Sequence, residues 1–261
     1  MGWKGMAIGG YIGSIFGGPL GAILGAVLGH KVENSAFSHG NRRGVSYSSM
    51  SRQDRANLFC ASAAAMLAKM AKADGTVTQT EIAGVENAFR RLGFTASARR
   101  YAIDVFRRAK DDRHTIYEYA REFAAAVDSV EVRELFYEIL WDVAGSDGEI
   151  RPTERLILQR IPRALGIRID WYAYFASRRS GGGSAGGFAP QDSLAEAYAI
   201  IGANPKDSAD ELKRKYRELA KKNHPDALRA QGLPEEMIGK ATERMSRINE
   251  AWTRIKAARG L

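Results

Sequence analysis

Cysteine, histidine and proline are scarce in this sequence, and some common catalytic motifs are missing. Its 261 residues include one cysteine, Cys60, four histidines and seven prolines. A single thiol excludes a disulfide framework and any metal site built from several cysteines. The sequence contains neither an HExxH motif nor a Walker phosphate-binding loop, which excludes zinc proteases of that type and P-loop nucleotidases. A hydrophobic fraction of 45% excludes disorder over the whole chain.

Charge of one sign is not concentrated in any domain-sized stretch. Lys and Arg outnumber Asp and Glu by 39 to 30, which gives a net charge of +9. Residues 1–51 hold 4 basic residues and 1 acidic residue, residues 52–191 hold 21 and 18, and residues 192–261 hold 14 and 11. Nucleic-acid-binding proteins usually gather basic residues in one stripe with aromatic residues between them. We therefore expect a solvated surface of mixed sign and no nucleic-acid partner.

Glycine, in contrast, is abundant, and much of it lies in residues 1–33. No charged residue occurs from Gly5 to Gly29, and about 20 apolar residues cross a bilayer as a helix. Glycine recurs at every fourth position of this run, which forms a groove where a second helix can approach closely. We predict a glycine-zipper membrane helix that spans once, with this groove as the contact of a homodimer. A re-entrant or interfacial hairpin bent at residues 17–19 and a cleaved signal peptide are alternatives.

The charges that flank this segment predict its orientation. Lys31, Arg42 and Arg43 follow it, whereas only Lys4 precedes it. Because basic residues favour the cytoplasmic side, we expect the large C-terminal part in the cytoplasm. A lone cysteine fits that reducing compartment. Residues 34–51 are rich in Ser, Gly and Arg and are expected to form a juxtamembrane tether.

Residues 52–178 predict an all-α bundle, because apolar residues recur at helical spacing without the long alternation typical of strands. Within them a pattern repeats at an offset of 73 residues. Asp74-Gly75 is followed by Glu81, Asp147-Gly148 is followed by Glu154, and a Leu-Gly pair follows each Glu. The repeat predicts two helical hairpins related by approximate two-fold symmetry, each with an Asp-Gly turn and a glycine stop.

This repeated Asp-Gly-x-[Val/Ile]-x-x-x-Glu pattern resembles the TerB-like fold, which is named after tellurite-resistance proteins. The resemblance raises a divalent-metal site, whose candidate ligands would be Asp74, Glu81, Asp147 and Glu154. Helix capping is the stronger interpretation, because Asp-Gly is ordinary turn chemistry and a Glu at the third helical position caps a helix start. We therefore expect no metal site, and we keep these four residues as candidates.

Residues 179–191 are rich in Gly and Ser and predict a flexible linker. In residues 192–261, a short amphipathic helix is expected to end at Gly202. A second helix should begin after Ser208, whose spacing to Glu211 is that of a capping box. On a helical wheel its apolar residues share one face, and the opposite face carries four basic residues, Lys213, Arg214, Arg217 and Lys221.

The second helix leads into the tripeptide His224-Pro225-Asp226. A residue that precedes proline avoids helical geometry, so this helix is expected to end near His224. An exposed loop should then lead to a last helix that starts near Pro234, where proline and acidic residues favour a helix start. We expect the second and last helices to be antiparallel, with Ile248 and Trp252 on the inner face of the last one.

Taken together, the basic helix, the His-Pro-Asp tripeptide and the segment Ile248-Asn249-x-Ala251-Trp252 resemble a J-domain. J-domain proteins stimulate ATP hydrolysis by DnaK-type seventy-kilodalton heat-shock chaperones, so the resemblance implies such a partner. It also implies that the chain activates a partner's ATPase, is not itself an enzyme and needs no cofactor. The implied partner-binding residues are His224, Pro225, Asp226, Lys213, Arg214, Arg217 and Lys221.

The order of membrane segment, TerB-like bundle, linker and terminal J-domain is similar to that of membrane-anchored bacterial co-chaperones. This resemblance implies single-pass attachment to the bacterial inner membrane, a cytoplasmic C-terminal part and a role in the stress response. An alternative assigns the main role to the TerB-like bundle, as a metal or envelope-stress sensor with an accessory J-domain. A third interpretation is a membrane scaffold that dimerises through the glycine groove.

Overall fold

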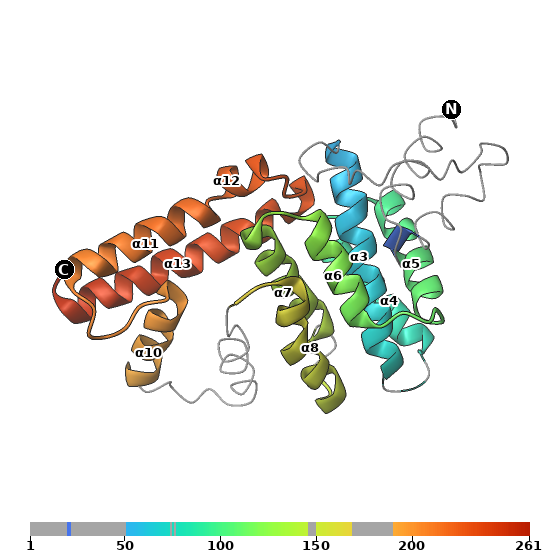
Figure 1. Ribbon diagram of the computed structural model, residues 1–261, viewed down its shortest axis with the longest axis horizontal. Coiled ribbons are helices and arrows are strands. Elements are labelled where there is room, and N and C mark those ends of the chain that lie inside the picture. The colour runs from blue at the N-terminus through green and yellow to red at the C-terminus, as the bar shows by residue number, and fades with distance from the viewer. Residues whose placement is uncertain (1–19, 22–50, 74, 76, 146–149, 169–189) are drawn as a thin grey trace. The chain divides into compact units, whose positions relative to one another are not determined.

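The computed structural model describes residues 20–21, 51–73, 75, 77–145, 150–168 and 190–261. All regular structure in these ranges is helical (Figure 1), which confirms the expected all-α fold class. The chain divides into two compact units, residues 1–168 with 231–237, and residues 169–230 with 238–261. Almost all of the predicted membrane segment, tether and linker lies outside the described residues. In the described part of the chain, no helix is both long and apolar enough to cross a bilayer.

Hydroxyl side chains set the start of several helices in the first unit. Thr95, Thr115 and Ser129 each accept a hydrogen bond from the backbone N–H of the third residue of the helix that follows. Such N-caps satisfy amide groups that have no partner inside the helix. The helices of this unit follow in the order α3 (Arg52–Ala73), α4 (Gln79–Arg91), α5 (Ala96–Ala109), α6 (Ile116–Ala126), α7 (Val130–Ala144) and α8 (Pro152–Leu165).

Aromatic side chains form the centre of this bundle. Phe59 of α3, Phe123 of α6 and Phe136 of α7 are fully buried. The rings of Phe123 and Phe136 stack with their centroids 4.0 Å apart, and Phe59 meets Phe136 edge-on at 4.9 Å. Buried aromatic pairs add roughly 0.5–1.5 kcal/mol beyond the area that they bury. The cluster therefore holds α3 firmly against α6 and α7.

The repeated sequence pattern marks two corresponding helix junctions. It joins α3 to α4 in the first copy and α7 to α8 in the second. Gly93 and Gly166 follow α4 and α8 with φ angles of +85° and +63°, in the left-handed region that residues with a β-carbon avoid. The predicted glycine stops are thus confirmed. Residues 146–149 of the second turn lie outside the described residues.

The second unit contains an antiparallel helix pair, as the sequence predicted. Tyr216 of α11 (Ala209–Asn223) stacks on Trp252 of α13 (Ile238–Arg259) with a centroid distance of 4.9 Å. Arg259 near the end of α13 donates to the carbonyl oxygen of Pro205, which precedes α11, at 2.7 Å, and the two helices lie side by side (Figure 1). Together with α10 (Pro190–Ile201) they share a buried core of Ala197, Tyr198, Ile201, Leu212, Ile248, Ala251, Trp252 and Ile255.

The connection between α11 and α13 differs from the expected loop. A short helix, α12 (Pro225–Ala230), starts where the loop was predicted, because Pro225 and Asp226 supply the proline and the acidic residue that favour a first helical turn. The predicted start of the last helix near Pro234 is a 3₁₀ turn, η2 (Glu235–Met237), and α13 begins only at Ile238. The prediction of a continuous loop was therefore wrong.

Candidate partner-binding site

The C-terminal end of α11 presents His224, Pro225 and Asp226, which we call the HPD corner. Helix α11 ends at Asn223, and His224 has an extended conformation with φ −61° and ψ 133°, as expected for a residue that precedes proline. Pro225 then opens α12, so the chain changes direction within one residue. The side chains of His224 and Asp226 keep 56% and 75% of their surface exposed. The corner thus displays both polar side chains to solvent.

Two local contacts orient these side chains. The backbone N–H of Asp226 donates to Nδ1 of His224 at 3.2 Å. When Nδ1 accepts a hydrogen bond, the proton of the neutral imidazole is on Nε2, which becomes the ring's donor. Oδ1 of Asp226 lies 2.6 Å from Nη1 of Arg229 in α12. Sequence reasoning missed Arg229, although a spacing of three residues from Asp226 within a helix is the signal for such a pair.

The four basic residues predicted for the exposed face of α11 are exposed, but their electrostatic environments differ. Arg214 lies 3.0 Å from Glu218 and 3.7 Å from Glu211. Among the described residues, no ion pair is formed by the other three, Lys213, Arg217 and Lys221. We call these three residues the open basic face of α11. Arg214, in contrast, has much of its charge compensated within its own helix.

The loop between α10 and α11 is braced by residues that sequence reasoning also missed. Nζ of Lys215 lies 2.7 Å from the Oδ2 atom of Asp207, and the backbone N–H of Asn204 donates to the same carboxylate at 2.9 Å. These two hydrogen bonds hold the pKa of Asp207 below its usual value. Arg259 adds donations to the backbone oxygens of Pro205 and Asp207 at 2.7 and 3.1 Å. The loop therefore fixes the start of α11, at the end opposite the HPD corner.

Three family models match the chain one after another. They are the co-chaperone DjlA transmembrane domain at residues 1–43, tellurite resistance protein TerB at residues 61–173, and the DnaJ domain at residues 196–258. Co-chaperone protein DjlA of Vibrio cholerae is 32% identical over 234 residues, which cover 81% of this chain and 81% of the relative. Co-chaperone protein DjlA of Escherichia coli K12 is 30% identical over 223 residues, with coverages of 80% and 82%. The chain belongs to the DjlA family.

Membership of the DjlA family confirms the resemblance to the TerB-like fold, the resemblance to the J-domain and the order of the two domains along the chain. The HPD corner lies in the residues that match the DnaJ domain, and the repeated Asp-Gly pattern lies in those that match TerB. The transmembrane-domain match covers the glycine-rich segment in which a span was predicted. The DnaJ domain and the DjlA relatives identify the chain as a J-domain co-chaperone. No solved structure matches the chain.

In the TerB region of this DjlA-family chain, only one of the four metal candidates, Glu154, has a side chain among the described residues. Glu154 is buried, and its carboxylate accepts a hydrogen bond from the backbone N–H of Arg151 at 3.0 Å, which is a helix-capping contact. Asp74 and Asp147 lie outside the described residues, and the side chain of Glu81 does as well. The described residues contain no cluster of three or more His, Cys, Asp or Glu that could hold a metal ion.

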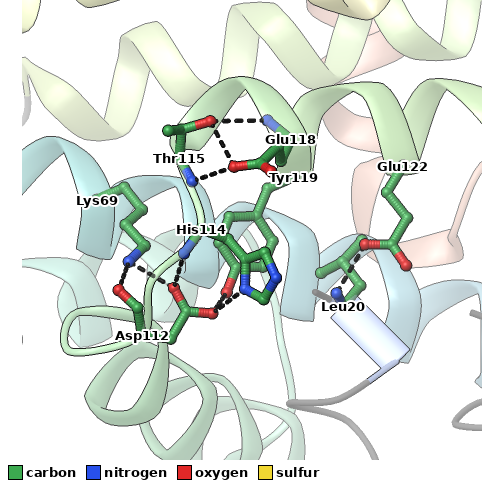
Figure 2. A network of polar contacts seen from close by, with 8 residues as sticks. All are labelled: Leu20, Lys69, Asp112, His114, Thr115, Glu118, Tyr119 and Glu122. Atoms are coloured by element: carbon green, nitrogen blue, oxygen red, sulfur yellow. Dashed lines mark hydrogen bonds and ion pairs between the residues drawn. The ribbon is translucent and has the colours of Figure 1, made fainter. Parts of the chain in front are cut away.

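A separate polar network in the same region centres on Asp112, between α5 and α6 (Figure 2). Oδ1 of Asp112 lies 2.5 Å from Nζ of Lys69, and Oδ2 lies 2.9 Å from Nδ1 of His114. The hydroxyl of Tyr119 also donates to this carboxylate. Partial burial by itself would raise the pKa of Asp112, but the hydrogen bonds from Lys69, Tyr119 and His114 together lower this pKa below its usual value. The network fixes the loop that joins two helices of the DjlA-family bundle.

Proposed function

We propose that this chain binds a DnaK-type seventy-kilodalton heat-shock chaperone through the HPD corner and the open basic face of α11, and that it stimulates ATP hydrolysis by that partner. The observation that carries the proposal is the exposed HPD corner at the end of a basic helix, within the residues that match the DnaJ domain. The partner supplies the nucleotide site and the hydrolytic chemistry. The co-chaperone supplies contacts that favour hydrolysis.

Each residue of the HPD corner has a separate task in this proposal. Pro225 fixes the change of direction, because its ring restricts its own backbone and that of His224. His224 offers the Nε2 proton as a donor, and Asp226 offers carboxylate oxygens as acceptors. Arg229 holds the Asp226 carboxylate at 2.6 Å, and the Asp226 amide holds the His224 ring. Groups that are oriented before binding lose less conformational freedom when the partner arrives.

The open basic face of α11 suits an acidic surface on the partner. Lys213, Arg217 and Lys221 lie on the helix that leads into the HPD corner. Exposed complementary charges mainly accelerate encounter and select the partner, and they are screened within about 8 Å at physiological salt. The proposed association is therefore fast, weak and sensitive to salt. Such kinetics suit a co-chaperone that must leave after each cycle of hydrolysis.

Membrane attachment is the second part of the proposed function. The N-terminal segment spans the bacterial inner membrane once, and the part of the chain that follows it lies in the cytoplasm. Two observations support this arrangement, the transmembrane-domain match at residues 1–43 and the basic residues Lys31, Arg42 and Arg43 after the uncharged run. The HPD corner would then lie in the compartment that holds cytoplasmic chaperones and ATP.

A single-turnover ATPase assay tests the activation. The full chain in detergent micelles is mixed with the DnaK-type chaperone loaded with ATP, and the hydrolysis rate should rise by about tenfold or more, a barrier change of about 1.4 kcal/mol. His224→Gln should abolish the rise, because it removes the oriented imidazole. His114→Gln makes the same change in the loop before α6 and should leave the stimulation intact. An unstimulated rate, or equal stimulation by His224→Gln, would exclude the proposal.

A further inference from the structure

An arginine-rich stretch gives one part of the bundle a strong positive charge. Residues 90–110 hold seven basic residues and one acidic residue, Asp104, for a net charge of +6. The rest of residues 52–191 holds 14 basic and 17 acidic residues. The small excess of basic over acidic residues in residues 52–191 therefore hides one strongly cationic region. The HPD corner and α11 lie elsewhere in the chain and give no reason for this concentration of charge.

Helix α5 gathers three of these arginines on one exposed face. Arg100, Arg107 and Arg108 are exposed, and their spacing of seven and eight residues places them on the same side of a helix. The other side of α5 is buried through Ala98, Ala102, Ile103, Val105, Phe106 and Ala109. Asp104 lies 3.8 Å from Arg107, and no ion pair of Arg100 or Arg108 occurs among the described residues. We call the three arginines the α5 cationic face.

The α5 cationic face lies beside the middle and the later part of α3, the helix that the N-terminal segment enters. Cys60 of α3 contacts the carbonyl oxygen of Ala98, and Lys69 of α3 donates to that of Asp112. Helices α3 and α5 therefore run side by side in the same direction. Residue 52, where α3 starts, follows the end of the transmembrane-domain match at residue 43. An extended chain of nine residues reaches at most about 30 Å.

We propose that the α5 cationic face docks on anionic lipid headgroups of the membrane that holds the N-terminal segment. This inference rests on the membrane attachment in the proposed function. Guanidinium groups match phosphate oxygens with paired hydrogen bonds. The cytoplasmic surface of a membrane is negatively charged, and each arginine close to it strengthens binding to the membrane roughly fivefold. The short connection keeps the face at high local concentration beside that surface.

Nucleic acid is the other large polyanion that such a face could attract, but the face lacks stacking groups. Single-stranded nucleic acids are bound by basic grooves in which exposed aromatic rings stack on the bases. The aromatic residues of α5 are Tyr101, whose hydroxyl is buried, and Phe106, which is fully buried. The exposed side of the helix therefore offers charge without an aromatic platform, which fits a lipid surface.

Energy transfer from α5 to the lipid headgroups tests this docking in the full chain. Cys60 is fully buried, and burial raises the pKa of its thiol, so a cysteine placed at exposed Ser97 is the thiol that a fluorescent maleimide labels. Ser97→Cys protein is reconstituted into phosphatidylcholine vesicles with or without a quarter of phosphatidylglycerol, with an acceptor dye on the headgroups. Flotation of the vesicles reports attachment separately from docking.

We expect the protein to float with both kinds of vesicle and to transfer energy more efficiently with phosphatidylglycerol, with the increase lost in 0.5 M NaCl. Arg100→Gln/Arg107→Gln/Arg108→Gln should weaken docking roughly 100-fold, the product of three fivefold terms, and abolish the increase. Arg155→Gln/Arg160→Gln/Arg163→Gln removes the same charge from exposed positions of α8 and should leave the increase intact.

Three results would overturn this inference. Flotation without a phosphatidylglycerol-dependent increase would remove the docking and leave the attachment standing. Failure to float would remove the attachment and the docking together, while the ATPase assay in micelles would still decide the activation. Hydrogen-exchange protection of α5 by an added oligonucleotide, with no effect of phosphatidylglycerol, would assign the face to nucleic acid.

Discussion

Gly166 ends α8 in a conformation that favours glycine. Its φ is +63°, and a β-carbon built at this position would lie 2.9 Å from Nη1 of Arg133, which donates to the carbonyl oxygen of Leu165 at 2.7 Å. Gly166→Ala should therefore destabilise the bundle by about 1–2 kcal/mol, measured as a lower urea midpoint for loss of bundle structure. Gly239→Ala, inside α13 where a β-carbon meets nothing within 4 Å, should stabilise its own unit by roughly 0.5–1 kcal/mol. Equal effects of the two changes would contradict this account.

Asp112 should make the stability of the bundle depend on acid. Its pKa is lowered in the folded chain, so the stabilisation that it gives is present above the usual aspartate pKa and is lost as the pH falls through the lower, folded value. Asp112→Asn should cost about 1–3 kcal/mol at pH 7 and much less at about pH 2, below the usual aspartate pKa. Urea unfolding of the full chain at the two pH values measures the difference.

Asp104→Asn on α5 is the control variant for the Asp112→Asn test. The side chain of Asp104 is 56% exposed, and it lies 3.8 Å from Arg107. Exposed ion pairs contribute little to stability, so the variant should follow the wild-type acid profile. A loss at pH 7 that persists unchanged at low pH in Asp112→Asn would show that packing, and not the charge of Asp112, stabilises the loop.

The residues whose role depends on their neighbours in the sequence could be predicted from the sequence. The HPD corner and the glycine stops were predicted because proline and glycine restrict or permit backbone angles locally. The Asp112 network was not predicted, because Lys69, Asp112 and Tyr119 come from separate segments and meet only after the helices pack. No spacing rule connects residues that are 43 positions apart.

In helix α11 the structure narrows the predicted partner-binding site, because it separates the four basic residues by their electrostatic environment. Arg214 is partly compensated by Glu211 and Glu218, whereas Arg217 and Lys221 belong to the open basic face. Arg217→Gln/Lys221→Gln should weaken binding to the DnaK-type chaperone by about tenfold at low salt, since exposed pairs contribute up to about 1 kcal/mol each. The salt dependence of the association rate should also flatten.

Two single variants control for this change in α11. Arg214→Gln should weaken binding less than Arg217→Gln does. Lys222→Gln removes an exposed charge from the other side of the same helix and should have the smallest effect. Titrations of the labelled co-chaperone against the partner at two salt concentrations give the affinities of the wild type, the double variant and the single variants Arg214→Gln, Arg217→Gln and Lys222→Gln. A larger loss for Arg214→Gln than for Arg217→Gln would refute the assignment of the open basic face.

The bounds of α11 were predicted closely, and those of α12 were not predicted at all. Ser208 caps the start of α11 through the Glu211 amide, and the following proline sets its end, so both signals are local. Helix α12 has six residues, which is too few for a hydrophobic period to show. The positive charge of residues 90–110 is hidden in the net charge of residues 52–191, because acidic residues elsewhere in that segment cancel it.

At the scale of the whole molecule, the N-terminal segment should determine where the co-chaperone acts and leave its chemistry unchanged. Deletion of residues 1–33 should move the chain from the membrane pellet to the soluble fraction once the membranes are washed with 0.5 M NaCl, which screens any remaining attraction of charges. Stimulation of the partner's ATPase in solution should stay within about twofold, because the HPD corner and α11 belong to a unit without those residues. Fractionation and the single-turnover assay on the same preparation provide both measurements.

The α5 cationic face makes the deletion more informative when the membranes are also washed with salt. A deleted chain that sediments at low salt and is released by 0.5 M NaCl would be held by screened charges alone, as the proposed docking requires. The same chain with Arg100→Gln/Arg107→Gln/Arg108→Gln should then be soluble at both salt concentrations. A deleted chain that resists the salt wash would show that a segment other than residues 1–33 inserts into the bilayer, which would overturn the proposed single N-terminal span.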